Sequence, residues 1–248
     1  PASASAFRRD EDLIMGRFRL GERIGSGGMG TVYRAFDERL QRTVAVKEIQ
    51  TAGADRVLRE AQAAARLNHP AIVTLYELGE RDGHALLVSE FVEGRTLDRV
   101  ARDGSVSDRD VAEIGTDLCE ALEHAHSRGV VHRDVKPHNA IVRPFDAGGR
   151  RAKLMDFGIA AVAGTPGLTA TGEVVGTLAY MAPEQAEGEM AGPEADVYSL
   201  ALTLYEAWAG INPVARRTPA QTARQIGRPV PSLAESRPDL PDGLIEHV

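Results

Sequence analysis

Apolar and polar residues alternate along the first part of the chain with the period of β-strands. Five short runs have this alternation and are separated by glycines and charged turns: 17–25, 30–38, 42–50, 72–80 and 84–92. The segment 54–70 differs, because its apolar residues recur at helical spacing until Asn68-His69-Pro70 ends the run. The pattern therefore predicts a β-rich region that contains one helix.

Helical spacing dominates the second part of the chain. Ser107 and Asp110 fit a capping box, with aspartate in place of the usual glutamate, and an amphipathic helix follows as far as Gly129. Residues 194–210 are apolar on nearly every side and predict a buried helix, whereas 152–157 predict a short buried strand.

The strand-like and helix-like patterns divide the chain into two parts. We expect an α+β fold with a flexible arm over 1–15, a small β-rich lobe over 16–90 and a larger, mainly helical lobe over 91–248. With 248 residues, of which 43% are hydrophobic, the chain is long enough for one large domain or two small lobes.

Charge and cysteine content narrow the classes of function. The formal net charge is −7 and the basic residues are scattered, so no basic stripe points to nucleic acid or an anionic membrane. The single cysteine, Cys119, excludes a disulfide framework and favours a reducing, cytoplasmic setting. No apolar run approaches membrane-spanning length, and the absence of an initiator methionine suggests a piece excised from a longer chain.

Two features of the β-rich lobe suit a nucleotide. The glycines of Gly25-Ser26-Gly27-Gly28-Met29-Gly30 lie between two predicted strands, where they let backbone N–H groups approach phosphates closely. Lys47 lies near the end of an apolar strand, and Glu60 on the following helix is a candidate partner for its ammonium. Each feature alone has an ordinary interpretation, namely a glycine-rich hairpin and a lysine that snorkels from a strand edge.

The segment 130–142, VVHRDVKPHNAIV, holds charged and hydrogen-bonding groups inside an apolar frame. Because Pro137 breaks a helix, we expect Asp134, Lys136 and Asn139 to converge from a loop. In these roles Asp134 would accept a hydroxyl proton, Lys136 would neutralise a transferring phosphate, and Asn139 would offer a neutral oxygen to Mg²⁺. For any one of these residues, an Asx-type turn with an ion pair is the ordinary alternative.

Two further motifs follow along the chain. Asp156-Phe157-Gly158 comes at the end of a hydrophobic strand, 22 residues after Asp134, where a carboxylate is well placed to bind a metal. Gly176-Thr177 and Ala182-Pro183-Glu184 close a threonine-rich loop, and a structural anchor is the ordinary interpretation of Glu184.

In this order the motifs resemble those of the eukaryotic-like protein kinases. GSGGMGTVY, VAVK, HRDVKPHN, DFG and APEQ stand in register from about Arg17 to Trp208, and the details are most similar to bacterial serine/threonine kinases of actinobacterial type. The resemblance implies a bilobal fold with a five-stranded antiparallel sheet and one helix, then a mainly helical lobe. It also implies transfer of the γ-phosphoryl group of ATP, with Mg²⁺ or Mn²⁺, to serine or threonine hydroxyls of proteins.

The resemblance also implies catalytic roles for five residues. Asp134 positions and deprotonates the substrate hydroxyl, and Lys136 stabilises charge on the γ-phosphoryl group. Lys47, paired with Glu60, holds the α- and β-phosphates. Thr177 matches the loop threonine that touches the catalytic aspartate and lysine.

Cofactor-binding roles follow from the same resemblance. Asn139 and Asp156 match the metal ligands, and Ser89 occupies the gatekeeper position, where a small hydroxyl would open a pocket beside adenine. The remaining residues that are expected to bind ATP are Ile24, Gly25, Ser26, Gly27, Gly28, Met29, Gly30, Val32, Ala45, Glu90, Val92, Thr96 and Ile141.

Regulation is expected in the threonine-rich loop. Thr169 and Thr171 match threonines that bacterial relatives autophosphorylate, and Arg133 is placed to pair with such a phosphate. Glu173 could supply part of this charge, so we expect phosphorylation to activate without being required. His132 is expected to pack inward as a structural residue and not to act as the general base.

The C-terminus departs most from the family pattern. In the family Glu184 pairs with an arginine near the end of the large lobe, and the chain stops at Val248 before such a position. We expect either that the last helices are missing or that a partner fills their place, which would expose apolar surface and favour a homodimer or a domain-swapped dimer. A membrane tether would require a segment outside this sequence.

Two other functions stay open at this point. A pseudokinase or nucleotide-binding scaffold is compatible with a truncated lobe, although Lys47, Glu60, Asp134, Asn139 and Asp156 are all present. A small-molecule phosphotransferase of kinase-like fold is disfavoured by Lys136, Thr177 and the APE segment, which suit a platform for peptide substrates.

Overall fold

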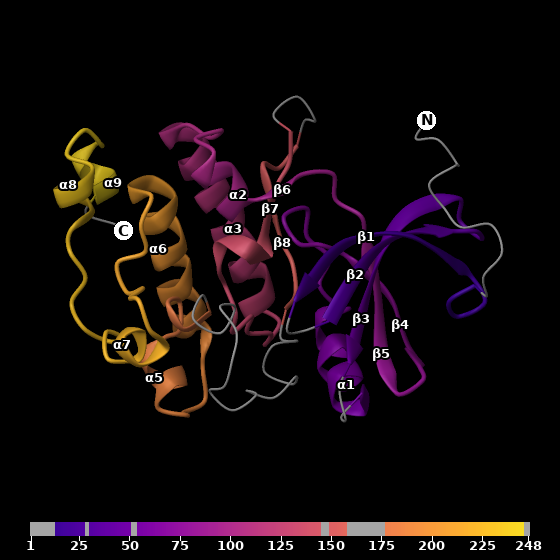
Figure 1. Cartoon of the computed structure of the whole chain (residues 1–248). Helices are drawn as coiled ribbons and strands as arrows, with labels where there is room; N and C mark the ends of the chain where they lie inside the picture. Colours follow the sequence, from indigo (N-terminus) through magenta and orange to yellow (C-terminus); the bar gives the residue numbers. More distant parts are fainter. Residues whose placement is uncertain (1–12, 28–29, 51–53, 145–148, 158–176, 246–248) are drawn as a thin grey trace. The chain divides into compact units, whose positions relative to one another are not determined.

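The computed structural model describes residues 13–27, 30–50, 54–144, 149–157 and 177–245. These residues form two compact units, whose elements are labelled in Figure 1. The N-terminal unit contains the described residues up to 68 together with 73–92, and the C-terminal unit contains 69–72 and the described residues from 93 onward.

An antiparallel sheet of five strands forms most of the N-terminal unit (Figure 1). The sheet order is β1-β2-β3-β5-β4, and the strands are β1 (Phe18–Gly27), β2 (Gly30–Asp37), β3 (Arg42–Gln50), β4 (Leu75–Arg81) and β5 (His84–Glu90). The five-stranded sheet expected from the sequence is therefore confirmed. The fourth strand begins three residues later than expected, because Ile72 instead bridges Leu154 in the C-terminal unit.

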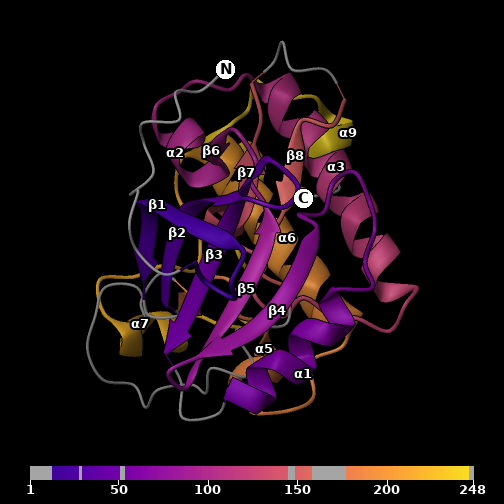
Figure 2. The ribbon, with the colours of Figure 1, turned by 90° about the vertical axis from the view of Figure 1, so that its right-hand side faces the viewer.

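Each face of this sheet is packed by a different apolar cluster. One cluster buries Ile14, Phe18, Ala35, Val44, Val46, Leu86 and Val88. The other joins the sheet to α1 (Ala54–Ala64), which packs against β4 and β5 (Figure 2), and consists of Ile49, Val57, Ala61, Ala85 and Leu87. Ile14 was expected within a flexible arm over 1–15, but its side chain is 5% exposed and packs in this core, so it does not belong to such an arm.

Helices dominate the C-terminal unit. They are α2 (Leu97–Arg102), α3 (Asp108–His126), α5 (Pro183–Ala186), α6 (Pro193–Ala209), α7 (Pro219–Ala223), α8 (Leu233–Ser236) and α9 (Asp242–Ile245). A second sheet, of order β6-β7-β8, contains β6 (Arg95–Thr96), β7 (Ala140–Val142) and β8 (Ala152–Leu154), and the 3₁₀ turn η2 (Pro137–Asn139) precedes β7.

The two long helices agree with the sequence pattern and pack against each other (Figure 1). At the start of α3 the Ser107 hydroxyl accepts a bond from the Asp110 N–H and the Asp110 carboxylate accepts one from the Ser107 N–H, so the expected capping box is confirmed. Gly115 brings α3 close to α6, because a β-carbon there would lie 3.1 Å from Leu204. Most of α6 is buried, as expected from its apolar surface.

Arg237 joins the ends of both long helices. Its guanidinium donates to both carboxylate oxygens of Asp108 at the start of α3 and to the carbonyl oxygen of Trp208 near the end of α6. Hydrogen bonds to Asp239 and Asp108 raise the pKa of Arg237. None of the described helices has the length and apolarity needed to cross a membrane.

Candidate active site

The loop between α3 and β7 carries the predicted catalytic residues, and a buried carboxylate holds its backbone. Asp196, on α6, accepts bonds of 2.7 Å from the backbone N–H groups of His132 and Arg133, and one of the same length from Nε2 of His126. Its side chain is fully buried. Arg133 has a φ of 66°, a left-handed conformation that is uncommon outside glycine, and Asp196 stabilises this turn.

His132 packs beneath the loop with no exposed surface. Its Nε2 donates to the carbonyl oxygen of Met155 at 2.9 Å, and its Nδ1 accepts from the N–H of Asp134 at 3.2 Å. Its ring lies 4.6 Å from the ring of Phe157. Because both ring nitrogens are used and buried, His132 is a structural residue, as predicted.

The side chain of Lys136 links two other predicted catalytic residues. Its Nζ lies 2.9 Å from each carboxylate oxygen of Asp134 and 3.0 Å from the hydroxyl of Thr177. Asn139 donates from Nδ2 to the carbonyl oxygen of Asp134 at 2.8 Å and to its carboxylate at 2.9 Å. Asp134 is only 7% exposed, so its carboxylate is held in a single orientation by charged and neutral donors.

Asn139 directly precedes β7 and Asp156 lies two residues beyond β8, at the same end of this antiparallel pair. The N–H of Met155 donates to the carbonyl oxygen of Asn139 at 2.9 Å, and Asp156 follows with a φ of 68°. The described side-chain bonds of Asn139 both use Nδ2, so its amide oxygen keeps its capacity to bind a cation. One amide oxygen and one carboxylate fit a hard divalent cation whose other ligands are phosphate oxygens and water.

The segment after Thr177 is fastened to the catalytic loop and to α6. Gln185 donates to the carbonyl oxygen of Arg133 at 3.0 Å, and the Ser199 hydroxyl donates to that of Tyr180 at 2.7 Å. The hydroxyl of Tyr180 bonds to Glu206, and burial together with this carboxylate raises its pKa.

Glu184 was expected to act as a structural anchor that pairs with an arginine. Within the part of the chain that the structure describes, no arginine forms an ion pair with Glu184, which is half-buried at the start of α5.

Residues predicted to bind ATP share one face of the N-terminal sheet. Lys47 is opposite Val32, and Ala45 is opposite Ser89, so the side chains of each pair lie on the same face. Ala45 and Lys47 are two residues apart and therefore also share a face. Ile49 continues this face and packs in the cluster that joins the sheet to α1.

The other expected ATP-binding residues are distributed over both units. In the N-terminal unit, Ile24, Gly25, Ser26 and Gly27 lie in β1, Gly30 begins β2, Glu90 ends β5 and Val92 follows it. In the C-terminal unit, Thr96 of β6 pairs with Ile141 of β7.

Several predictions fall on residues outside the described part. They concern Gly28, Met29, Gly158, Thr169, Thr171, Glu173 and Gly176, together with the side chain of Glu60, whose backbone lies in α1.

Two buried carboxylates that bind backbone N–H groups of this unit were missed in the sequence: Asp196 on α6, which holds the catalytic loop, and Asp117 on α3. For Asp196 the available signal was an acidic residue inside the apolar run 194–210, whereas Asp117 lies among other acidic residues of its helix and gave no such signal. Such a carboxylate must find donors inside the protein.

Comparison with known proteins identifies relatives over almost the whole chain. A family model described as "Protein kinase domain" matches residues 18–241. The chain is 42% identical over 229 residues to "Serine/threonine-protein kinase PknB" of Mycobacterium leprae, covering 87% of this chain and 36% of the relative. It is 36% identical over 239 residues to "Serine/threonine-protein kinase PrkC" of Bacillus subtilis, covering 93% of this chain and 36% of the relative. The chain thus spans about a third of the length of these curated relatives.

A solved structure resembles the fold over a similar extent. The crystal structure of the Mycobacterium tuberculosis PknI kinase domain superimposes with a TM-score of 0.74 and 29% sequence identity. The match covers 96% of this chain and 90% of that chain.

Proposed function

Because the chain belongs to the protein kinase domain family, we propose that it is the catalytic domain of a serine/threonine protein kinase. The observation that carries this proposal is the position of the Lys136 ammonium, within 3.0 Å of both Asp134 and the Thr177 hydroxyl. A carboxylate, an ammonium and a threonine hydroxyl in contact suit transfer of a phosphoryl group to an alcohol.

In the proposed reaction Asp134 accepts the proton of the substrate hydroxyl as that oxygen attacks. Lys136 keeps the Asp134 carboxylate oriented and offers positive charge to the phosphoryl oxygens. Asn139 holds the same carboxylate from the other side. Thr177 orients Lys136, and its segment is a candidate platform for the substrate peptide.

Protein kinases use ATP and a divalent cation, which supply the phosphoryl group and neutralise its charge. We assign the cation to Asn139 and Asp156, with Mg²⁺ as the metal and Mn²⁺ as an alternative, because both residues offer hard oxygen ligands. The triphosphate is assigned to Lys47 and to the glycine-rich residues of β1 and β2, and adenine to the sheet face that contains Val32 and Ala45. Residues 16–90 would thus bind nucleotide, while 91–248 would supply catalysis.

Regulation by autophosphorylation is part of the proposal. Thr169 and Thr171 are its expected sites, and the exposed side chain of Arg133 is a candidate partner for the phosphate. Gln185 and Asp196 bind the backbone of Arg133, so a phosphate on this side chain would act directly on the turn before Asp134.

The partners are proposed to be proteins that present serine or threonine, and ATP use favours a cytoplasmic location. A homodimer remains a prediction. The exposed apolar side chains of Met190, Val197 and Ile211 in the C-terminal unit are candidates for its interface. A membrane tether also remains a prediction.

The proposed function is tested by incubating the chain with ATP and either Mg²⁺ or Mn²⁺, followed by mass spectrometry of the chain and of a peptide library. We expect phosphothreonine or phosphoserine, with a rate about 10²–10⁴-fold lower for Asp134→Asn, because the proton acceptor is lost. Asp82→Asn is the matched control, since it makes the same chemical change at an exposed turn with a φ of 52°, which asparagine tolerates.

Two results would contradict the proposal. One is an equal rate of incorporation by wild type and Asp134→Asn. The other is ATP binding by wild type with no incorporation under any condition, which would indicate a nucleotide-binding scaffold instead.

A further inference from the structure

The strand that leads to Asp156 is short. β8 contains three residues, Ala152–Leu154, and Asp156 lies two residues beyond its end. A shift of β8 by one residue would move Asp156 by about 3.3 Å along the strand and turn the side chains of β8 to the opposite face. Because Mg²⁺ requires oxygen ligands at about 2.0–2.1 Å in near-octahedral geometry, the position of β8 along its axis controls whether Asp156 can act with Asn139.

One edge of β8 is paired with β7. Ile141 is opposite Lys153, the N–H of Met155 donates to the carbonyl oxygen of Asn139, and the N–H of Arg143 donates to that of Arg151. The neighbouring N–H groups of Ala152 and Leu154 point away from β7, since hydrogen-bonding direction alternates along a strand. The N–H of Leu154 donates to the carbonyl oxygen of Ala71 at 2.8 Å.

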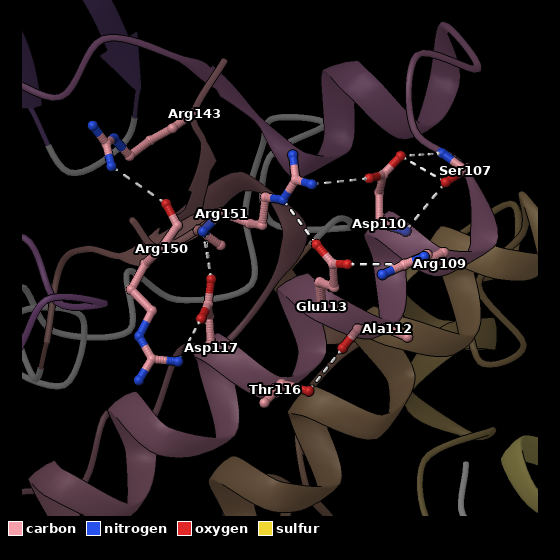
Figure 3. A network of polar contacts seen from close by, with 11 residues as sticks. Ser107, Arg109, Asp110, Ala112, Glu113, Thr116, Asp117, Arg143, Arg150 and Arg151 are labelled. Carbon is pink, nitrogen blue, oxygen red and sulfur yellow. Dashed lines mark hydrogen bonds and ion pairs between the residues drawn. The ribbon is translucent and has the colours of Figure 1, made fainter. Parts of the chain in front are cut away.

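Asp117 of α3 receives the N–H groups of Arg151, in the bend before β8, and of Ala152, the first residue of β8. Its Oδ2 accepts from the N–H of Arg151 at 2.6 Å and from the N–H of Ala152 at 3.0 Å. Its Oδ1 accepts from Nη1 of Arg150 at 2.9 Å, and the residue is 5% exposed (Figure 3). Two consecutive backbone donors on one carboxylate oxygen fix the position of β8 relative to α3.

Neighbouring acidic residues on α3 bind the same arginines differently. Glu113 accepts from Nε of Arg151 at 2.8 Å (Figure 3). Glu120 pairs with the guanidinium of Arg150. Both contacts join two side chains and involve no backbone group. Among the side chains that the structure describes, Asp117 binds the N–H groups of Arg151 and Ala152 at the start of β8, and His132 binds the carbonyl oxygen of Met155 beyond its end.

We propose that Asp117 is a positioning residue for the metal site, acting through β8. Its carboxylate holds the N–H groups of Arg151 and Ala152, and the strand carries this position to Met155, whose N–H reaches Asn139. In this proposal the Asp117 carboxylate on α3 sets the position of Asp156 relative to Asn139. The inference rests on the proposed assignment of Asn139 and Asp156 to the cation.

The test compares Asp117→Ala and Asp117→Asn with Glu113→Ala. Glu113→Ala removes one carboxylate from the same helix and one contact of the Arg151 side chain, which still lies 4.0 Å from Asp110, while leaving the backbone contacts of β8 intact. Asp117→Asn keeps one oxygen acceptor and serves as the conservative variant. It also keeps the test possible if Asp117→Ala does not fold.

Two measurements separate positioning from a general loss of stability. The first is the affinity for Mn²⁺ in the presence of a non-hydrolysable ATP analogue, followed by electron paramagnetic resonance, which does not depend on turnover. The second is the Mg²⁺ activation constant of phosphoryl transfer alongside the KM for peptide. Amide hydrogen exchange of peptides from 149–157 reports directly on β8.

We expect Asp117→Ala to weaken Mn²⁺ binding and raise the Mg²⁺ activation constant by about 10–100-fold, with the peptide KM nearly unchanged. Exchange at 149–157 should become faster, Asp117→Asn should be intermediate, and Glu113→Ala should match wild type. The proposal is overturned if Asp117→Ala and Glu113→Ala behave alike, or if Asp117 variants lower the melting temperature without altering metal affinity. Wild type that binds Mn²⁺ but transfers no phosphate would contradict the kinase activity alone, and the exchange and binding results would still decide the role of Asp117.

Discussion

Asp196→Asn tests whether a single carboxylate of α6 shapes the catalytic loop. In the wild type the two oxygens of Asp196 accept from the N–H groups of His132 and Arg133 and from Nε2 of His126. Asparagine has almost the same shape, but it offers one acceptor oxygen, and its NH₂ group must face at least one of these donors. The substitution therefore changes hydrogen bonding without opening a cavity.

The magnitude follows from the buried donors. One buried N–H that loses its acceptor costs about 1–3 kcal/mol, and a bond that loses its charged acceptor weakens by about 1 kcal/mol. We therefore expect the free energy of unfolding to fall by about 2–4 kcal/mol, a large share of the 5–15 kcal/mol typical of a domain. The left-handed turn at Arg133 loses its support as well, so Asp134 would be displaced and kcat would fall by about 10²-fold.

Urea denaturation and steady-state kinetics measure both effects. Asp108→Asn is a suitable control, because it weakens the exposed ion pair with Arg237, for which we expect a loss of about 0–1 kcal/mol. A loss below about 1 kcal/mol for Asp196→Asn, together with unchanged kcat, would refute the reasoning.

Three further predictions concern the N-terminal unit. Gly30→Ala would place a β-carbon 2.1 Å from the carbonyl oxygen of Glu48, so we expect a loss of about 1–3 kcal/mol in a thermal unfolding assay and weaker nucleotide binding. The Arg17 guanidinium lowers the pKa of Asp37, so Asp37 stabilises the fold above its unfolded pKa of about 3.9 and this contribution is lost as the pH falls below that value. Urea titrations from pH 6 to pH 3 should show a weaker pH dependence for Asp37→Asn, and an identical dependence would contradict this. Ser89→Met should weaken binding of bulky ATP-site inhibitors, whereas equal inhibitor affinity would exclude an open pocket beside Ser89.

Local sequence patterns predicted most elements of the fold. The five strands of the first sheet, the capping box at Ser107 and the buried helix at 194–210 were all expected, since hydrophobic periodicity and capping residues act over a few neighbours in the chain. The helices α7, α8 and α9 were not expected. Each has four or five residues, which is too short for a periodic pattern to emerge.

The candidate site was predicted only in part. The catalytic-loop motif led to Asp134 and Lys136, the family resemblance led to Thr177, and these three side chains do meet in the structure. Their roles in catalysis stay predictions. The anchoring of the loop by Asp196 was not expected, because its donors lie 63 and 64 residues away in the chain.

The sequence by itself determined the longer strands and helices and which chemical groups are available, because these properties depend on neighbouring residues. Only the tertiary structure decided which buried carboxylates hold the active-site backbone. Asp196 and Asp117 bind main-chain N–H groups, which every residue except proline carries, so no residue pattern marks their partners in advance. The partners are selected when α6 packs beside the catalytic loop and α3 packs beside β8.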